Sequence, residues 1–342
     1  MKVAFFIQEI SCTSGKSDGV RNQAWAWAEG LRQLGVDIHL ASPWDTDNFY
    51  EYDVVHMFGF YPGIERDLRY LKGKFKAKIA ISPIIDTNRP YRITKLASWL
   101  HCPKLRMYSA LGGLRKGVAL VDGWFSRSEY EGNYIKNAFN VPSNKVFKVM
   151  LPTRLPAVEG NGQREDFCLI VSYLPSARKN IWRLIDAAIK YKFKLVLAGA
   201  KVNSEQFDKM MQVVKGHDNI KVVGYLQDDE LVKLYQRARV FALPSTLEGV
   251  GLVALEAAAN GCDVALTSWG APKEYYNGLV KLVDPLSVDS IGKAICEFMD
   301  GDTYQPALRE YIAKHNSIKA SSKNLLNAYT AMLSDGIRRE EI

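Results

Sequence analysis

The sequence lacks the marks of a membrane-spanning, disulfide-bonded or zinc-binding protein. None of its 342 residues lies in an apolar run of about 18 residues, so no membrane-spanning helix is expected. The five cysteines are far apart and fit no metal-ligand spacing: Cys12, Cys102, Cys168, Cys262 and Cys296. An odd and scattered set of this kind predicts reduced thiols in the cytoplasm.

Two common nucleotide-binding motifs are missing as well. The segment SGKSDG, residues 14–19, does not fit the P-loop, which requires a glycine, four residues and then Gly-Lys-Ser/Thr. No G-x-G-x-x-G follows the first apolar stretch, which argues against a dinucleotide dehydrogenase. Gln8 and Glu9 interrupt that stretch, so we expect a buried strand there and no secretion signal. An exported solute-binding protein is disfavoured for the same reason.

The charge of the chain is unevenly distributed. Residues 1–155 hold 22 Lys and Arg against 14 Asp and Glu, a net charge of +8, whereas residues 156–342 hold 23 of each. The excess lies mostly between Arg66 and Lys116. A basic half indicates an anionic partner, for which nucleic acid, an anionic membrane and a phosphorylated acceptor are the candidates.

Strand and helix patterns alternate along the whole chain and restart after residue 166. The predicted strands are Val3–Gln8, Asp37–Ala41, Asp53–Phe58, Lys78–Ile81, Gly123–Ser126, Lys145–Val149, Phe167–Ser172, Lys194–Ala198, Ile220–Val223, Val240–Leu243, Asp263–Thr267 and Val280–Val283. The predicted helices are Gly19–Leu34, Ile181–Tyr191, Ser204–Val214, Asp229–Arg237, Ile291–Met299 and Ser321–Leu333. Two such sets predict an α/β fold with two doubly wound parallel sheets.

The segment between the two sets, residues 152–166, is rich in proline, glycine and charge and predicts the domain boundary. We expect one domain over residues 1–155 and a second over residues 156–320. A C-terminal helix and tail, residues 321–342, would follow a loop that holds His315 and Asn316 and would pack back on the first domain. The cleft between the domains is the expected binding site, since ligands of such sheets bind at the carboxyl ends of strands.

Residues 244–263, PSTLEGVGLVALEAAANGCD, carry the strongest functional signal. A strand ends at Pro244, a glycine-rich loop follows, and a helix then runs to a stop glycine at Gly261. Backbone N–H groups at such a helix start are suited to bind a phosphate. Glu248 lies at the mouth of that loop, and Glu256 lies more than one turn into the helix, from where it could reach a sugar hydroxyl.

These residues resemble glycosyltransferase family 4, whose members are retaining enzymes of the GT-B fold. The match is strongest over Asn219–Leu282, through NIKVVGYL, DDELVKLYQRARVFALPS, EGVGLVALEAAANG and GAPKEY. In the first half, DGVRNQAWAWAEGLRQLGVDIHLAS and YDVVHMFG match more loosely. The resemblance implies two Rossmann-like domains, an N-terminal one for the acceptor and a C-terminal one for the donor.

The resemblance implies a role for each matching donor-side position. Glu256 would hold the nucleotide ribose, and Glu248 would lie beside the donor sugar. Lys179 would neutralise the leaving diphosphate, assisted by Arg178. The remaining donor-binding positions that it implies are Gly19, Tyr225, Leu226, Gly249, Val250, Gly251 and Leu252, of which Tyr225 and Leu226 would cradle the base.

The chain departs from the family at two positions. Many members have Gly-Arg after the strand that here ends at Ser172, whereas this chain has Tyr173, so phosphate neutralisation would fall to Arg178 or be weaker. Many members also have a histidine near the donor sugar, but ISPIIDTNRP contains none. Ser82 or Asp86 would then have to face the acceptor side. The pattern does not distinguish front-side attack from a covalent intermediate.

Each candidate also has a purely structural interpretation. Glu248 could cap the next helix and Lys179 could be a solvated residue, but the motif favours the site roles. For Glu256 a functional role is favoured more strongly, because burying an unpaired carboxylate is costly. Glu274 fits a site and a helix cap equally. His56 fits best as a core or rim histidine. In a loop after the second strand, Asp45 and Asp47 fit best as solvated residues, and no metal or other cofactor is expected.

The segment RPYRITKLASWLHCPKLRMYSALGGLRKG, residues 89–117, mixes basic and apolar residues. It predicts either docking on anionic lipid head groups or a lipid-diphosphate acceptor, or an ordinary helix pair with a basic surface. Together these patterns indicate a metal-independent retaining glycosyltransferase, cytoplasmic or peripheral at the inner membrane face. It would move a sugar from a nucleotide-diphosphate sugar to a surface-glycan, lipopolysaccharide or lipid-linked acceptor, with no nucleic-acid partner. The alternative is a catalytically weak GT-B-like sugar-binding or partner subunit.

Overall fold

The computed structural model describes residues 1–7, 19–42, 44–45, 51–102, 109–155, 157, 164–201 and 204–340. The chain divides into two compact units. Unit 1 comprises Met1–Pro152 and Ser317–Ile342, and unit 2 comprises Thr153–Asn316. The predicted divisions, after residues 155 and 320, lie three and four residues further along the chain.

Unit 1 contains a parallel sheet of six strands in the order β2-β1-β3-β4-β5-β6. The strands are β1 (Lys2–Ile7), β2 (Asp37–Leu40), β3 (Val54–Phe58), β4 (Lys78–Ser82), β5 (Gly123–Ser126) and β6 (Val146–Lys148). β3 is buried along its whole length, which explains why its sequence VVHMF does not alternate. The strand order reverses between β1 and β3, where a doubly wound sheet offers its ligand crevice.

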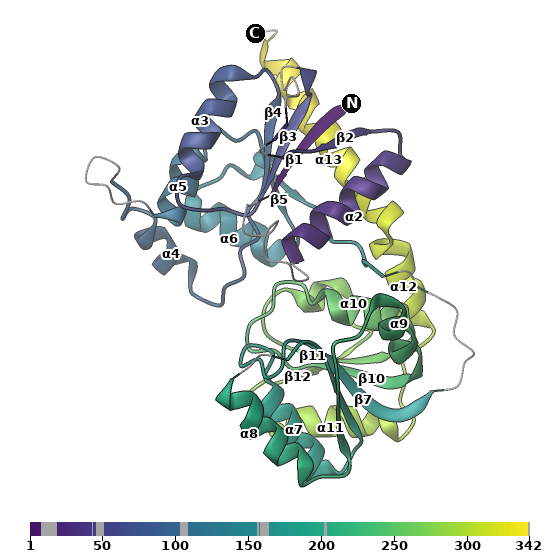
Figure 1. Ribbon diagram of the computed structural model, residues 1–342. Helices are drawn as coiled ribbons and strands as arrows, with labels where there is room; N and C mark the ends of the chain where they lie inside the picture. The colour runs from purple at the N-terminus through teal and green to yellow at the C-terminus, as the bar shows by residue number, and fades with distance from the viewer. Residues whose placement is uncertain are drawn as a thin grey trace. The chain divides into compact units, whose positions relative to one another are not determined.

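Helices cover both faces of the unit 1 sheet (Figure 1). One face is packed against α3 (Ile64–Lys74), α5 (Ala110–Gly117) and α6 (Glu129–Phe139), whose apolar residues join those of the strands in one buried cluster. The helix α4 (Tyr91–Ala97) packs against α6. On the other side, α2 (Gly19–Gln33) packs against α13 (Ile318–Glu340).

Unit 2 contains a second six-stranded parallel sheet, in the order β12-β11-β10-β7-β8-β9. Its strands are β7 (Glu165–Val171), β8 (Leu195–Ala198), β9 (Ile220–Gly224), β10 (Ala238–Leu243), β11 (Asp263–Thr267) and β12 (Lys281–Val283). Read from β9, this is the Rossmann order 3-2-1-4-5-6, and the reversal point lies between β7 and β10.

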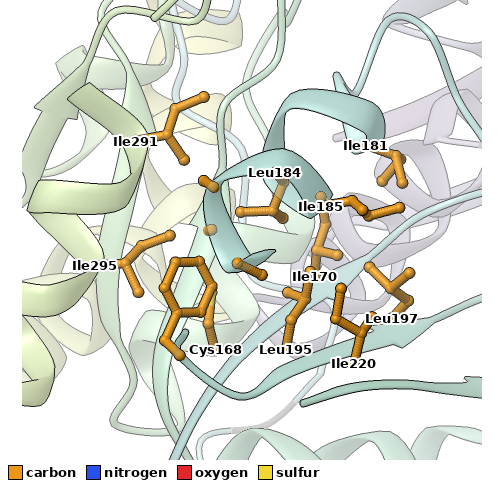
Figure 2. Close-up of a cluster of buried hydrophobic side chains, with 14 of the residues drawn as sticks. Cys168, Ile170, Ile181, Leu184, Ile185, Leu195, Leu197, Ile220, Ile291 and Ile295 are labelled. Carbon is orange, nitrogen blue, oxygen red and sulfur yellow. The ribbon is translucent and has the colours of Figure 1, made fainter. Parts of the chain in front are cut away.

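The unit 2 sheet is likewise covered on both faces (Figure 1). One face is packed against α7 (Ile181–Tyr191), α8 (Glu205–Lys215) and α11 (Val288–Met299). Figure 2 shows Ile181, Leu184 and Ile185 of α7 meeting Ile170 of β7 and Leu195 of β8 in this core. The remaining helices are α9 (Asp228–Arg237), α10 (Leu252–Ala259) and α12 (Ala307–Asn316), and α10 packs against both α9 and α12.

The predicted α/β class with two doubly wound parallel sheets is confirmed, but one local prediction is wrong. His315 and Asn316 lie in α12 and not in a loop, and α13 begins at Ile318 instead of Ser321. The two helices are separated by Ser317 alone. Asn316 is fully buried, whereas a polar residue in a loop is expected to be exposed.

Several negative expectations concern the described part of the chain. Cys102, Cys168, Cys262 and Cys296 are free thiols there, whereas Cys12 lies outside the described residues. Among the helices that the structure describes, none has both the length and the apolar character needed to cross a bilayer.

Candidate functional site

The candidate donor site lies at the reversal point of the unit 2 sheet. The loop after β7 carries Arg178 and Lys179, and the loop after β10 carries Glu248. The two loops are tied together, since the Thr246 amide donates to the Arg178 carbonyl at 2.9 Å. Adjacent parallel strands end at the same edge of a sheet, so residues 69 positions apart converge there.

Lys179 and Glu248, both predicted site residues, form an ion pair between Nζ and Oε2. The Ser245 hydroxyl donates to the same carboxylate oxygen at 3.2 Å. The side chains are largely enclosed, with exposed fractions of 15% for Lys179 and 7% for Glu248. In such surroundings each charge stabilises the other, and removal of one would leave a poorly solvated charge behind.

Asn180 fixes the position of this pair. It adopts the left-handed conformation at the start of α7, with φ 60°, and its side chain is buried. Its amide nitrogen donates to the carbonyls of Pro244 at 2.9 Å and Pro285 at 2.6 Å. One side chain thereby connects the segments that follow β7, β10 and β12. The sequence analysis did not single out Asn180, although asparagine is among the residues that tolerate this conformation.

The glycine-rich loop leads directly into α10. Gly251 has a φ of +78°, and a Cβ at this position would lie 2.7 Å from the Leu243 side chain. Any other residue here would therefore be both strained and crowded. Leu252 begins the helix, Val250 is buried before it, and Gly249 lies in the bend after Glu248. The first N–H groups of a helix have no partners within it, so this helix start is suited to bind an anion.

Glu256 is buried on α10, but it is paired. Its Oε1 lies 3.3 Å from Arg154 Nε, and the Tyr235 hydroxyl donates to Oε2 at 3.3 Å. Burial raises the pKa of Glu256 to about 7, while the charge of Arg154 acts in the opposite direction. Arg154 also contacts Asp228 at 2.6 Å. A structural partner therefore exists for this carboxylate, and its burial alone does not assign it to a ligand.

Tyr225 and Leu226 follow β9, two strands away from β7 at the same edge of the sheet. Tyr225 is 62% exposed and Leu226 is half-buried. Gly199, at the end of the intervening strand, would place a Cβ 1.7 Å from the Ser172 carbonyl oxygen, so only glycine fits there. Tyr173, at the position of the missing arginine, is also exposed.

The acceptor-side candidates of unit 1 are held by other side chains. Ser82 is buried at the end of β4, and its hydroxyl lies 2.9 Å from His56 Nε2. His56 Nδ1 lies 2.5 Å from the Tyr329 hydroxyl of α13, so His56 is the satisfied core histidine that was predicted. Asp86 contacts Arg127 at 2.8 Å, and Arg127 also contacts Glu131.

The other positions considered from the sequence have local contacts. Gly19 is the first residue of α2 and is exposed, while residues 14–18 before it lie outside the described part. Asp45 accepts from the Ser42 amide at 2.5 Å and lies 2.7 Å from His39, whereas Asp47 is not described. Glu274 lies in the first turn of a 3₁₀ helix, η4 (Pro272–Tyr275). No cluster of three metal-ligating side chains occurs among the described residues.

Similarity to known proteins coincides with unit 2. Residues 154–315 match the family of glycosyl transferases group 1. The match extends over nearly the whole of unit 2. The match contains the Lys179–Glu248 pair, the start of α10 and Glu256.

The chain is similar over shorter stretches to curated glycosyltransferases. The O-antigen chain mannosyltransferase B of Escherichia coli is 29% identical over 137 residues, which are 37% of this chain and 35% of that protein. A GDP-mannose-dependent α-(1-6)-phosphatidylinositol monomannoside mannosyltransferase of Mycobacterium tuberculosis is 33% identical over 139 residues, 38% of this chain and 34% of that protein. Each match spans about a third of the relative's own length.

The fold of both units has solved counterparts. HepE of Anabaena, in complex with UDP and glucose, has a TM-score of 0.69 at 15% identity and covers 97% of this chain and 100% of its own. The predicted GT-B fold and the predicted resemblance to glycosyltransferase family 4 are thereby confirmed.

Proposed function

We propose that the protein is a retaining glycosyltransferase that moves a sugar from a nucleoside-diphosphate sugar to a glycan or lipid-linked acceptor, without a metal. The main support is the enclosed Lys179–Glu248 pair beside the glycine-led start of α10, within the family segment. Support for a polysaccharide acceptor comes from the O-antigen mannosyltransferase relative. The proposal that the sugar keeps its anomeric configuration rests on the resemblance to glycosyltransferase family 4.

The reaction requires stabilisation of a leaving diphosphate. The acceptor oxygen bonds to the anomeric carbon, the diphosphate leaves with the electron pair of its bond, and the acceptor proton is released. Negative charge grows on the diphosphate, where the Lys179 ammonium and the first N–H groups of α10 would stabilise it, assisted by Arg178. Glu248 would face the donor sugar, where positive charge develops on the ring.

Glu256 would accept a hydrogen bond from a ribose hydroxyl. Arg154 and Tyr235 hold its carboxylate from the protein side, which would fix its orientation for that contact. Tyr225, exposed at the end of β9, would stack on the base. Tyr225 follows β9, Lys179 follows β7 and Glu248 follows β10, so these three groups are distributed along one edge of the unit 2 sheet.

A thermal-shift screen of UDP-, GDP-, ADP- and dTDP-sugars tests the donor half of this proposal. A true donor should raise the melting temperature, and the shift should grow with donor concentration, because the donor binds the folded state. Release of the nucleoside diphosphate then tests turnover, and Glu248→Ala should abolish it. A donor that binds without turnover would favour the catalytically weak subunit, and the absence of any shift would contradict both.

We further propose that unit 1 contacts an anionic membrane surface through α4 and the turn after it. Four apolar side chains are exposed there, Ile93, Leu96, Trp99 and Leu100, which we call the α4 surface. The Arg115 guanidinium lies 3.8 Å from the centre of the Trp99 ring. Residues 87–121 contain seven Lys and Arg and neither Asp nor Glu. Exposed apolar groups among basic ones are typical of helices that lie in a membrane interface.

Vesicle co-sedimentation tests this contact. The protein should sediment with phosphatidylcholine vesicles that contain phosphatidylglycerol and much less with pure phosphatidylcholine. Leu96→Asp should reduce sedimentation, whereas Leu286→Asp, at an exposed apolar position of unit 2, should not. Equal sedimentation with both vesicle types, or by both variants, would indicate that the α4 surface is an ordinary basic helix pair.

A further inference from the structure

Arg154 links two carboxylates of unit 2 that belong to different helices. Its Nε lies 3.3 Å from Glu256 Oε1, and its Nη1 lies 2.6 Å from Asp228 Oδ2. Glu256 is buried on α10, whereas 62% of the Asp228 side chain is exposed at the start of α9. A guanidinium is planar and presents its N–H groups in a fixed fork, so this one group sets the separation between a buried carboxylate and an exposed one.

The backbone around Arg154 is anchored within unit 2. The Thr153 amide donates to the Asn316 carbonyl of α12 at 2.8 Å, and the residues on both sides, Thr153 and Leu155, are buried. The Arg154 side chain is 28% exposed. A partly exposed ion pair such as Arg154–Asp228 adds little to the stability of a fold. Its consequence is that the Asp228 carboxylate is held in one place at the surface of unit 2.

Asp228 follows closely on the segment proposed to bind the base. Tyr225 precedes it by three residues and is exposed at the end of β9. Leu226, between them, is half-buried, so the segment packs against unit 2. If Glu256 binds the ribose and Tyr225 stacks on the base, as proposed above, Asp228 is placed to meet the edge of that base.

A carboxylate at the edge of a base selects among bases by their hydrogen-bond donors. An ionised carboxylate is an acceptor only, and each of its oxygens has two lone pairs, so Asp228 can accept two further N–H groups while Arg154 contacts Oδ2. Guanine presents two adjacent donors, N1–H and the 2-amino group. Uracil and thymine present one N3–H between two carbonyl oxygens, and adenine presents its 6-amino group beside the acceptor N1. Each of these three would set a lone pair against the carboxylate.

We propose that Asp228 binds the edge of a guanine, so that the donor is a guanosine-diphosphate sugar. The Asp228 carboxylate accepts from N1–H and the 2-amino group while Glu256 accepts from the ribose, and Arg154 sets the spacing between the two acceptors. This inference rests on the proposed function, because it uses the ribose contact of Glu256 and the base contact of Tyr225. It makes Asp228 the residue that determines which nucleotide the protein accepts.

Titration calorimetry with nucleoside diphosphates tests the proposal. Among GDP, UDP, ADP and dTDP, GDP should bind most tightly. Inosine diphosphate differs from GDP only in lacking the 2-amino group, and it should bind about 10- to 100-fold more weakly, which is the effect of one hydrogen bond to a charged group. In Asp228→Ala, GDP should bind more weakly than in the wild type, and the two purine nucleotides should bind within about threefold of each other.

Asp229→Ala is the matched control. Asp229 is the next residue, exposed in the same first turn of α9, and its loss should leave the preference for GDP over inosine diphosphate at the wild-type value. The comparison of these two nucleotides isolates the contact to the base. Any disturbance of Arg154 or Glu256 in Asp228→Ala would weaken both nucleotides equally, because they share one ribose and one diphosphate.

Two results would overturn the proposal and leave the proposed function standing. One is tighter binding of UDP, ADP or dTDP than of GDP. The other is a preference for GDP over inosine diphosphate that persists unchanged in Asp228→Ala. If none of the four nucleotides binds to the wild type, the proposed function itself fails, and the assignment of Asp228 fails with it.

Discussion

The two units differ in how completely the polar side chains near the carboxyl ends of their strands are hydrogen-bonded. In unit 1, Ser82 at the end of β4 and His56 in the middle of β3 are buried and bonded to each other, and His56 also bonds to Tyr329 of α13. In unit 2, Lys179 and Glu248 lie in loops beyond the strands, remain partly exposed, and leave the nearby Tyr276 hydroxyl without a partner among the described residues. A network in which every hydrogen-bonding group has a partner stabilises a fold. A charged network with an unpartnered group is suited to bind a ligand.

The candidate residues of unit 1 differ from those of unit 2 in the same way. Ser82 was expected to face an acceptor, but its hydroxyl bonds to His56, which lies 26 residues earlier in the chain. Nothing in ISPIIDTNRP reveals that contact. In unit 2 the candidate residues are in the loop sequences themselves, and the structure brings Lys179 and Glu248 together as an ion pair that the motif did not specify.

The largest expected effect is on catalysis in unit 2. Glu248→Gln should lower donor turnover by about 10²–10³-fold, since it removes the charge opposite the developing positive ring. Release of nucleoside diphosphate measures this effect. Glu165→Gln, which removes an exposed carboxylate paired with Arg237 in the same unit, should remain close to wild type. Equal losses in the two variants would refute a special role for Glu248.

The next effect should be on the stability of unit 1. His56→Leu leaves the buried hydroxyls of Ser82 and Tyr329 without their common partner, which should cost about 3 kcal/mol of unfolding free energy. Hydrogen exchange of β3, β4 and α13 in urea would measure the loss. The melting-temperature shift caused by a donor should persist, and its disappearance would show that the network also serves the donor site.

Acid should act on the two units with opposite signs. Burial lowers the pKa of His56 to about 3, so unfolding takes up a proton below pH 6.5, and stability should fall by about 2 kcal/mol between pH 7 and pH 5. Burial raises the pKa of Glu256 to about 7, so the folded state holds the extra proton above pH 4.5. Stability should therefore rise by about 2 kcal/mol over the same interval.

Urea unfolding at pH 7 and pH 5 separates the two contributions. In His56→Leu the opposing loss is absent, so stability should increase toward pH 5, and in Glu256→Gln it should decrease. No change between pH 7 and pH 5 in His56→Leu would mean that Glu256 titrates as it does in an unfolded chain, and no change in Glu256→Gln would mean the same of His56.

The smallest expected effect concerns the exposed aromatic at the end of β9. Tyr225→Ala should weaken donor binding by about 1 kcal/mol, or roughly fivefold, through loss of stacking on the base. Titration with UDP-glucose and GDP-mannose measures it. Tyr70→Ala, at an equally exposed position on α3 of unit 1, serves as the control and should bind as wild type does.

Local pattern was enough for most of the strands. β5 and β11 have the predicted bounds, Gly123–Ser126 and Asp263–Thr267, because short apolar runs between turn residues mark buried parallel strands. The α12 helix (Ala307–Asn316) was missed, and of its apolar residues only Leu308 and Ile312 are buried, together with Asn316. The basic segment of residues 89–117 does contain a helix pair, α4 and α5, which agrees with both interpretations given for it.

The candidate donor site could be predicted where it follows a motif, but not where it depends on contacts between residues far apart in the sequence. Arg154 reaches Glu256 from 102 positions away and stands in a linker sequence that predicts no such role. Tyr276 is adjacent to a motif, GAPKEY, but its unpartnered hydroxyl is a property of three-dimensional burial. Neither the Arg154–Glu256 contact nor the burial of the Tyr276 hydroxyl can be read from sequence spacing, because both depend on how separate strand ends are brought together.

Unit 1 is formed by two separate stretches of the chain, and this affects how it can fold during synthesis. Its sheet is complete by residue 148, but α13, which packs against α2 and supplies Tyr329 to the core, is translated only after all of unit 2. The Trp27 indole donates to the Ser321 hydroxyl of α13, so this buried side chain has no partner there until α13 has left the ribosome. A ribosome adds about 5–20 residues per second. Unit 2 can therefore fold as soon as it has been synthesised, whereas unit 1 lacks α13 for several seconds more. A nascent chain stalled before residue 318 should accordingly bind chaperones through unit 1.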